Sequence, residues 1–388
     1  MSERTAVVVG AGIGGVTAAA ALSRRGWRVT LLERAPELGE VGAGISVWPK
    51  ALQVLDGLGA KQRLGDAGID AVQGGLRRPD GRWLIRVSGT AMEAPMMVHR
   101  ARLHEAITAT FPASVQIRTG VTVVGVEQDA TSATVIGSAG EEFTADLVVA
   151  ADGLRSVVRT ALNPGHPGPR YSGYTAFRGV AEVDRPDDGG ETWGRGYRFG
   201  YLPLVDGRVY WYATATAPAQ AKPAQAKPAQ AKPVQPELDV TELFQHWHDP
   251  IPALVGKTPP ETVLRNDVYD LALPLPPFVT GRVVLLGDAA HAMTPNLGQG
   301  ACAAIQDAGV LAEQLERYGE QPAALESYDR IRRTATTKLV RRSRRLGVLG
   351  QVANPVAATT RDGVLALIGQ AARLLPNRRP TTQPVRPA

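Results

Sequence analysis

The sequence is poor in cysteine: its 388 residues include one, Cys302. A single thiol excludes an internal disulfide framework, a cysteine-ligated zinc cluster and the paired redox cysteines of disulfide reductases. Long apolar runs are missing as well, since no stretch of about 18 apolar residues occurs. The N-terminus shows no signal segment. These absences favour a cytoplasmic location.

Metal-ligand spacing is also absent from the six histidines. We expect His246 and His248 to lie in a surface helix, and no metal site is predicted. Cys302 is expected to be a packing residue and not a nucleophile.

Positive charge is concentrated at one end of the chain. Residues 330–388 contain 13 lysines and arginines and one acidic residue, Asp362, so they carry +12, and since the whole chain carries +6 the remainder carries −6. A basic tail can bind nucleic acid or an anionic membrane, but no nucleic-acid-binding motif accompanies it. We expect the solvated face of a helix, no nucleic-acid partner and no membrane contact.

The first 33 residues have the pattern of a βαβ unit. Residues 6–9 are an apolar strand, the glycine-rich turn Gly10-Ala11-Gly12-Ile13-Gly14-Gly15 follows, and an alanine-rich helix leads to a second strand at 28–32. Glu33 lies 18 residues after Gly15, close to the spacing of about 20 expected for an acid that binds a ribose hydroxyl. The glycines and the helix N-terminus would hold a pyrophosphate, so dinucleotide binding is predicted.

The remaining strands indicate two domains, for which the length and the 44% apolar content suffice. Antiparallel pieces at 121–127 and 132–137 interrupt the series of buried strands, which continues at 146–150 and 282–286, and residues 171–215 form a separate group of strands. The predicted fold is therefore α/β: a Rossmann-like cofactor domain assembled from discontinuous segments, a second β-sheet domain for substrate, and C-terminal helices. The cofactor domain is assigned residues 1–70, 101–165 and 279–388, and the substrate domain residues 71–100 and 166–278.

A low-complexity insert occupies residues 219–233, where Ala-Gln-Ala-Lys-Pro occurs three times. The regular prolines block a long helix and little apolar surface is available for burial, so a semi-extended surface loop is expected.

Excision of residues 219–233 should therefore leave the activity of the protein within a few-fold of that of the parent, because the segment has nothing to bury. The activity and the melting temperature of the shortened protein test this. An insoluble or inactive product would show that the insert packs against the body.

Four motifs, in this order, resemble those of the class A FAD-dependent monooxygenases, the para-hydroxybenzoate-hydroxylase-like family, and the likeness extends along nearly the whole chain. The first is the glycine turn with Glu33-Arg34, followed by Gly42-Ala43-Gly44-Ile45-Ser46. The second is Arg100, and the third is Ala151-Asp152-Gly153. The fourth and most specific runs from Gly287-Asp288 through His291 and Pro295 to Gly298-Gln299-Gly300-Ala301-Cys302.

The resemblance implies FAD as the cofactor and NADPH or NADH as co-substrate. It implies that Asp288 binds the ribityl chain or ribose, that Arg100 lies against FAD, that Asp152 serves both cofactors, and that the glycines after Leu297 form the turn beneath the flavin. His291 is expected to be structural. The implied cofactor-binding residues are Gly10, Gly12, Gly14, Gly15, Glu33, Arg34, Gly44, Ser46, Arg100, Val124, Asp152, Asp288, Gly298, Gln299, Gly300, Ala301 and Cys302.

The activity that the resemblance implies is hydroxylation or epoxidation of an aromatic or other electron-rich organic substrate with O2, through a flavin C4a-hydroperoxide, by a monomer or homodimer. A flavin halogenase is excluded because its Trp-x-Trp-x-Ile-Pro segment is absent. A flavin-binding module without turnover, acting through its basic C-terminal helix, remains as an alternative.

The residues expected at the reacting centre are Arg198, Tyr210 and Pro295. Arg198 and Tyr210 lie on two strand candidates joined by the turn Asp206-Gly207, where alternation would place them on one face. An arginine and a tyrosine together suit an anionic substrate oxygen, although pairing of Arg198 with an acid is an equal alternative. Aromatic residues of this region are expected to keep water from the flavin, some of them belonging to the sheet core: Phe177, Phe199, Tyr201, Tyr210, Trp211 and Tyr212.

Overall fold

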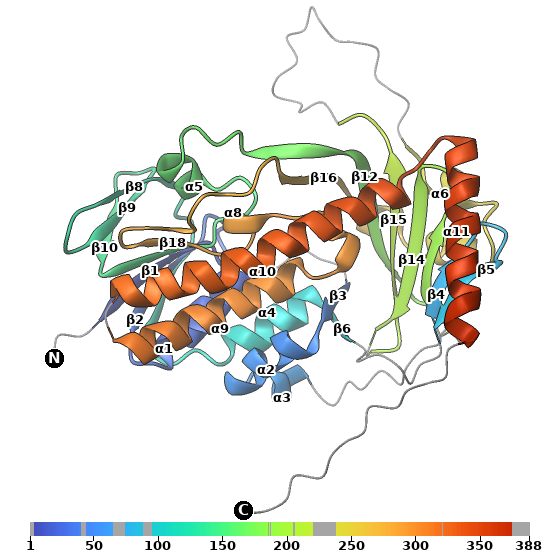
Figure 1. The fold of residues 1–388 in the computed structure, drawn as a ribbon. Coiled ribbons are helices and arrows are strands. Elements are labelled where there is room, and N and C mark those ends of the chain that lie inside the picture. Colours follow the sequence, from blue (N-terminus) through green and yellow to red (C-terminus); the bar gives the residue numbers. More distant parts are fainter. Residues whose placement is uncertain are drawn as a thin grey trace, which may run out of the picture.

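The computed structural model describes residues 4–39, 44–64, 74–87, 95–184, 186, 188–204, 206–219, 238–319 and 321–374. A six-stranded sheet with its helices and a seven-stranded sheet lie at opposite ends of the molecule, and the long helix α10 (Gln321–Gly350) runs beside both (Figure 1). All of the insert except Ala219, and Gly42-Ala43 of the first motif, lie outside the described residues.

The six-stranded sheet contains the predicted βαβ unit. Strand order is β17-β18-β11-β1-β2-β7, with parallel pairing everywhere except between β17 and β18. Its elements are β1 (Thr5–Val9), α1 (Ile13–Ser23), β2 (Arg28–Leu32), β7 (Val115–Arg118), β11 (Leu147–Ala150), β17 (Val279–Thr280) and β18 (Val283–Leu285). Because neighbouring strands come from distant parts of the chain, the prediction of a Rossmann-like unit built from discontinuous segments is confirmed.

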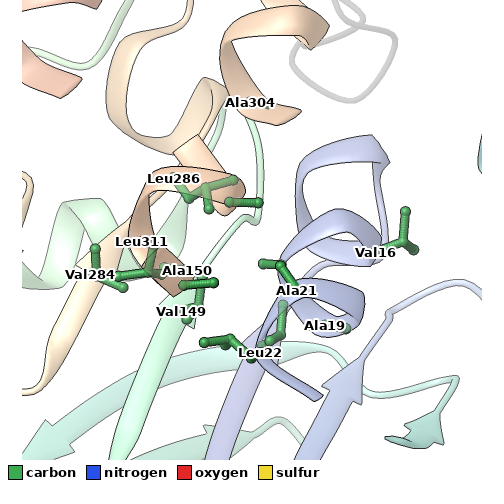
Figure 2. Close-up of a cluster of buried hydrophobic side chains, with 14 of the residues drawn as sticks. Val16, Ala19, Ala21, Leu22, Val149, Ala150, Val284, Leu286, Ala304 and Leu311 are labelled. Carbon is green, nitrogen blue, oxygen red and sulfur yellow. The ribbon is translucent and has the colours of Figure 1, made fainter. Parts of the chain in front are cut away.

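Small side chains let two helices pack closely against this sheet. Helix α1 contacts α9 (Gly300–Tyr318), and the alanines of α1 are almost fully buried. Figure 2 shows Ala21 and Leu22 of α1 close to Val149 and Ala150 of β11, with Leu311 of α9 beside them. Removal of this apolar surface from water is the main contribution to the stability of this part of the fold. The close packing also sets the direction in which the N-termini of α1 and α9 point.

The seven-stranded sheet has the order β16-β12-β15-β14-β13-β4-β5 and is antiparallel except between β13 and β4. Its strands are β4 (Gly74–Arg77), β5 (Trp83–Val87), β12 (Pro169–Ala181), β13 (Gly190–Trp193), β14 (Tyr197–Pro203), β15 (Val209–Thr216) and β16 (Leu264–Leu271). Helices α6 (Val240–Phe244) and α7 (Ile251–Gly256) cover one face, where they form an apolar core with the sheet. The predicted hairpin exists, since β14 and β15 pair with Leu202 opposite Tyr210.

Two smaller sheets and several short helices complete the described structure. The predicted antiparallel pieces form a sheet with β10 (Glu142–Ala145), and β3 pairs with β6 beside the cofactor domain. The elements are β3 (Gly44–Val47), α2 (Pro49–Gly57), α3 (Lys61–Leu64), β6 (Met96–His99), α4 (Arg100–Thr108), β8 (Val123–Gln128), β9 (Ala133–Gly137), α5 (Val157–Leu162), the 3₁₀ turn η3 (Pro260–Thr262), α8 (Asp288–His291) and the 3₁₀ turn η4 (Pro295–Leu297).

The expectation of a surface helix around His246 and His248 is wrong, because α6 ends at Phe244 and these residues form the turn that follows. Trp247 packs edge-on against Phe244, with ring centroids 4.8 Å apart. The Nε2 atom of His248 lies 2.8 Å from the hydroxyl of Thr192, and burial lowers the pKa of His248. The contacts of Trp247 and His248 therefore attach this turn to α6 and to the sheet.

The basic C-terminal region forms α10 (Gln321–Gly350) and α11 (Pro355–Leu374). Arg341, Arg342 and Arg345 are exposed, as expected of a solvated face. Arg332, however, is buried against Asp307, and Arg344 binds Asp270 on β16. Part of the positive charge therefore neutralises acids inside the body and is not available to a partner. No helix in the described ranges is both long and apolar enough to cross a membrane.

Candidate active site

The glycine turn closes tightly around the N-terminus of α1. A Cβ atom on Gly15 would lie 1.8 Å from the carbonyl oxygen of Gly10, so no other residue fits there. Gly12 is the N-cap of α1 and no side chain caps this helix end, which leaves its first N–H groups directed into the cavity described below. An anionic pyrophosphate is the group that such an end binds.

Glu33 lies beside this turn. Its carboxylate accepts hydrogen bonds from the backbone N–H groups of Ala11 at 2.8 Å and Ala35 at 2.9 Å. The next residue, Arg34, is exposed. Val124 lies on β8 and is 52% exposed. The segment that leads into β8 lies beside Glu33, because the N–H of Val121 donates to the Glu33 carbonyl at 2.9 Å. The structure thus brings Glu33, Arg34 and Val124 into one neighbourhood, although none of the three lines the cavity.

The β3–β6 pair supplies the next wall. A Cβ atom on Gly44 would lie 2.6 Å from Cγ of Tyr210, so the absence of a side chain allows the tyrosine ring to lie against this strand. Ser46 and Arg100 line the same cavity, with Arg100 the first residue of α4. These residues join the cofactor domain to the seven-stranded sheet.

Asp288 begins α8 and faces the cavity. Its side chain is accessible to solvent there, yet surrounding protein desolvates the carboxylate and raises the pKa of Asp288, an effect that His291, Arg100 and Arg159 oppose. A carboxylate in such a place readily accepts hydrogen bonds from hydroxyl groups of a bound molecule.

Behind Asp288 lies a buried charge network centred on Asp307. The carboxylate is 2.6 Å from Nε2 of His291 and 2.6 Å from Nε of Arg332, and it accepts the Gly287 N–H at 2.9 Å. Burial alone would raise the pKa of Asp307, but His291 and Arg332 lower it to about 2. These contacts agree with a structural role for His291. Sequence reasoning missed Asp307, although an acid within the apolar stripe of α9 was a usable signal.

The loop from Thr294 to Gln299 connects α8 to α9. Asn296 holds it in place: its Nδ2 donates to the Tyr174 hydroxyl at 3.0 Å and to the carbonyl of Ser343 at 3.0 Å, and its Oδ1 accepts from Arg198. Helix α9 begins at Gly300, with Gln299 as its N-cap. Its positive end therefore points into the cavity, where a reduced flavin would place negative charge.

Cys302 is buried in the first turn of α9. Its thiol donates to the Ser46 carbonyl at 3.1 Å, and burial raises its pKa to about 11. Both facts favour packing over reactivity.

Asp152 binds the first turn of α5, whose N-cap is Ser156. Its Oδ2 accepts from the N–H groups of Val157 at 2.8 Å and Val158 at 3.2 Å. Its Oδ1 is buried without a hydrogen-bond partner among the described residues, and burial raises the pKa of Asp152. Because a buried acceptor is costly without a donor, this oxygen fits a ligand hydroxyl. The residues present are therefore compatible with FAD.

The cavity joins these parts to the seven-stranded sheet and has a volume of about 470 Å³, within the usual range for a ligand site. Its lining includes residues of the glycine turn, the β3 strand, the Asp288 region, the Pro295–Ala301 segment and one sheet face. Of the predicted residues it brings together Gly12, Gly14, Gly44, Ser46, Arg100, Arg198, Tyr210, Asp288, Pro295, Gly298, Gln299, Gly300 and Ala301. Gly10, Gly15, Glu33, Asp152 and Cys302 lie outside the lining.

Strand alternation divides the predicted aromatic residues between two faces. Tyr210 and Tyr212 line the cavity, whereas Phe177, Phe199, Tyr201 and Trp211 belong to the core beneath α6 and α7. Burial raises the pKa of both cavity tyrosines, so they remain neutral phenols at physiological pH.

Arg198 faces the cavity but is 2% exposed and already has partners. Its Nε donates to Glu191 at 3.0 Å, its Nη2 also binds Glu191, and its Nη1 binds Asn296. The alternative that Arg198 pairs with an acid is therefore the one seen. Arg178, Tyr212 and Thr214, which sequence reasoning did not assign to substrate, share the cavity-facing side of the sheet.

Comparison with known proteins agrees with this site. A family model described as an FAD binding domain matches residues 3–343. The chain is 39% identical over 372 residues to the aurachin C monooxygenase/isomerase of Stigmatella aurantiaca, covering 94% of each. It is 35% identical to the 3-amino-4-hydroxybenzoate 2-monooxygenase of Streptomyces cremeus, covering 92% of this chain and 90% of that one.

Among solved structures, HpxO of Klebsiella pneumoniae complexed with FAD and uric acid superimposes with a TM-score of 0.81 at 30% identity, covering 94% of this chain and 93% of that one. A salicylate hydroxylase substrate complex superimposes with a TM-score of 0.74 at 25% identity, covering 96% of this chain and 95% of that one. The fold, the cavity and these likenesses lead to one conclusion: the chain belongs to the class A FAD-dependent monooxygenases, a family of hydroxylases that act on aromatic substrates.

Proposed function

We propose that this enzyme uses NADPH or NADH and O2 to hydroxylate or epoxidise an aromatic or other electron-rich substrate in the cavity between the two sheets. The single observation that carries the proposal is the continuity of this cavity, from the N-termini of α1 and α9 to the tyrosine-bearing face of β15. When bound, FAD supplies the redox chemistry, accepting electrons from NAD(P)H and activating O2 for transfer of one oxygen atom.

The protein's own residues would bind the cofactor, orient the substrate and exclude water. Asp288 and Glu33 would accept hydroxyl groups of FAD, and the N-terminus of α9 would face negative charge on the reduced ring. Tyr210 would orient the substrate as a donor or acceptor. Arg198 would position Pro295 through Asn296, and the rings of Tyr210 and Tyr212 would help to keep the reacting centre dry.

A flavin-binding module that acts through a basic helix has less support. Arg332, Arg333 and Arg344 are engaged with Asp307, Asp329 and Asp270. Those arginines therefore stabilise the body of the enzyme, and the relatives are monooxygenases.

The test is NAD(P)H oxidation by the FAD-loaded enzyme in air, with each of three compounds taken from the names of the relatives: salicylate, urate and 3-amino-4-hydroxybenzoate. At least one should stimulate oxidation and yield a product one oxygen atom heavier by mass spectrometry. Stimulated oxidation that yields only hydrogen peroxide with every compound, or no stimulation at all, would contradict the proposal for this substrate class.

A further inference from the structure

Two arginines share the face of the seven-stranded sheet that lines the cavity. In the strand register Arg178 lies opposite Tyr212, and Arg198 lies opposite Thr214. Since directly opposed residues share one face of a sheet, both guanidinium groups belong to the cavity wall. Their surroundings decide which of the two can neutralise a bound anion.

The charge of Arg198 is already balanced. Glu191 receives hydrogen bonds from two of its nitrogens, and the group is almost completely buried. A Cβ atom on Gly350 would lie 2.8 Å from its Cδ, so α10 packs directly on the side chain. Releasing this arginine for a substrate would leave Glu191 partly buried without its partner, which is costly.

Arg178 has a different environment. Its side chain is half-buried, and its Nη1 donates a hydrogen bond to the neutral amide oxygen of Asn266 at 3.3 Å. Within the described ranges no carboxylate lies at ion-pair distance from it. Arg178 and Tyr210 line the same cavity, and burial raises the pKa of Tyr210, a rise that the charge of Arg178 opposes.

A second groove meets the cavity at Arg178. Arg178 lines both, and the groove also contains His99, Arg208 and Lys257, with Glu182 as the acid among its described lining residues. Arg208 is paired with Asp206, so Arg178 and Lys257 supply the positive charge that remains. Such a groove attracts anions towards the cavity.

We propose that Arg178 binds an anionic oxygen of the aromatic substrate, a carboxylate or a deprotonated hydroxyl, with the Tyr210 hydroxyl as a second donor, and that the substrate passes through this groove. The inference rests on the proposed function, since it assumes that the cavity is the substrate site. An ionised oxygen would receive a charge-assisted hydrogen bond from a guanidinium that lacks an acidic partner, at no cost to an existing ion pair.

The experiment is a binding titration of the FAD-loaded protein, followed by the change in flavin absorbance and without turnover. The probes are salicylate and 3-amino-4-hydroxybenzoate, each compared with its neutral carboxamide. A charge-assisted hydrogen bond contributes about 1.5–3 kcal/mol, so the parent enzyme should bind at least one acid roughly 10- to 100-fold more tightly than its amide.

Arg178→Met should abolish most of this preference while FAD content and amide affinity stay within about two-fold, and Arg178→Lys should restore part of it. The matched control is Arg265→Met, because Arg265 lies over the Phe177 ring on the opposite face of the sheet. It should keep the preference for the acid.

Three results would overturn the inference: no preference for either acid in the parent enzyme, an unchanged preference in Arg178→Met, or an equal loss in Arg265→Met. Failure of the proposed function would be seen differently, as a protein that binds the acids with normal preference but does not oxygenate them.

Discussion

Replacing Asp307 with asparagine should lower the free energy of unfolding by roughly 3 kcal/mol or more, because removing one partner of a buried ion pair leaves the other charge uncompensated. Asp307 is fully buried, and Arg332, His291 and the Gly287 N–H all depend on it. Urea unfolding followed by circular dichroism measures the loss.

The same carboxylate makes stability depend on pH. Its pKa is about 2 in the folded protein, against an ordinary value of 3.8. Because the pKa is lower in the folded protein, the ionised carboxylate adds on the order of 2 kcal/mol to the free energy of unfolding at any pH above the pKa of the unfolded chain. This contribution disappears as the pH falls from about 4 towards 2. Asp307→Asn should show a flatter stability profile in this window.

Glu316→Gln is the matched control, since Glu316 forms an exposed ion pair with Arg25. Exposed pairs contribute about 0–1 kcal/mol, so this variant should remain close to the parent. Equal effects of the two substitutions would show that the buried network does not stabilise the fold.

The second large effect concerns FAD. Asp288→Ala should leave the fold largely intact and lose FAD during purification, because the variant lacks the carboxylate that we propose to accept cofactor hydroxyl groups. Removing hydrogen bonds to a charged group weakens binding by about 10- to 100-fold for each bond. Folding should not suffer, since the native carboxylate is desolvated and its pKa is raised.

The ratio of flavin to protein absorbance and an FAD titration of the apoprotein measure this loss. Asp206→Ala is the control, because Asp206 lies in the turn between β14 and β15, away from the cavity, and is bound to Arg208. A fully yellow Asp288→Ala protein with unchanged FAD affinity would refute the role given to Asp288.

Features encoded by local sequence could be predicted. The glycine turn and Glu33 depend on residues close in the chain, and they were found from spacing and turn chemistry. The shared face of Arg198 and Tyr210 also followed from the two-residue period of strands.

Features that depend on distant partners could not be predicted in this way. Nothing in the neighbourhood of Arg332 indicates that it meets Asp307, 25 residues earlier. Alternation specifies the face of Arg198 and not its partner, so the sequence left an anionic substrate and an acidic side chain as equal alternatives. Glu191 on the adjacent strand supplies the negative charge. Because Glu191 neutralises Arg198, Arg178 is the cavity arginine that we propose to bind a substrate anion.

The most direct test of the central claim is an isotope experiment. The FAD-loaded enzyme is incubated with NADPH or NADH and with the compound that stimulates oxidation most strongly, once under ¹⁸O2 in ordinary water and once under ordinary O2 in ¹⁸O-labelled water. We predict that the product carries one labelled oxygen atom in the first case and none in the second. A product labelled from water, or an unchanged substrate with hydrogen peroxide as the sole oxygen product, would contradict a monooxygenase working in this cavity.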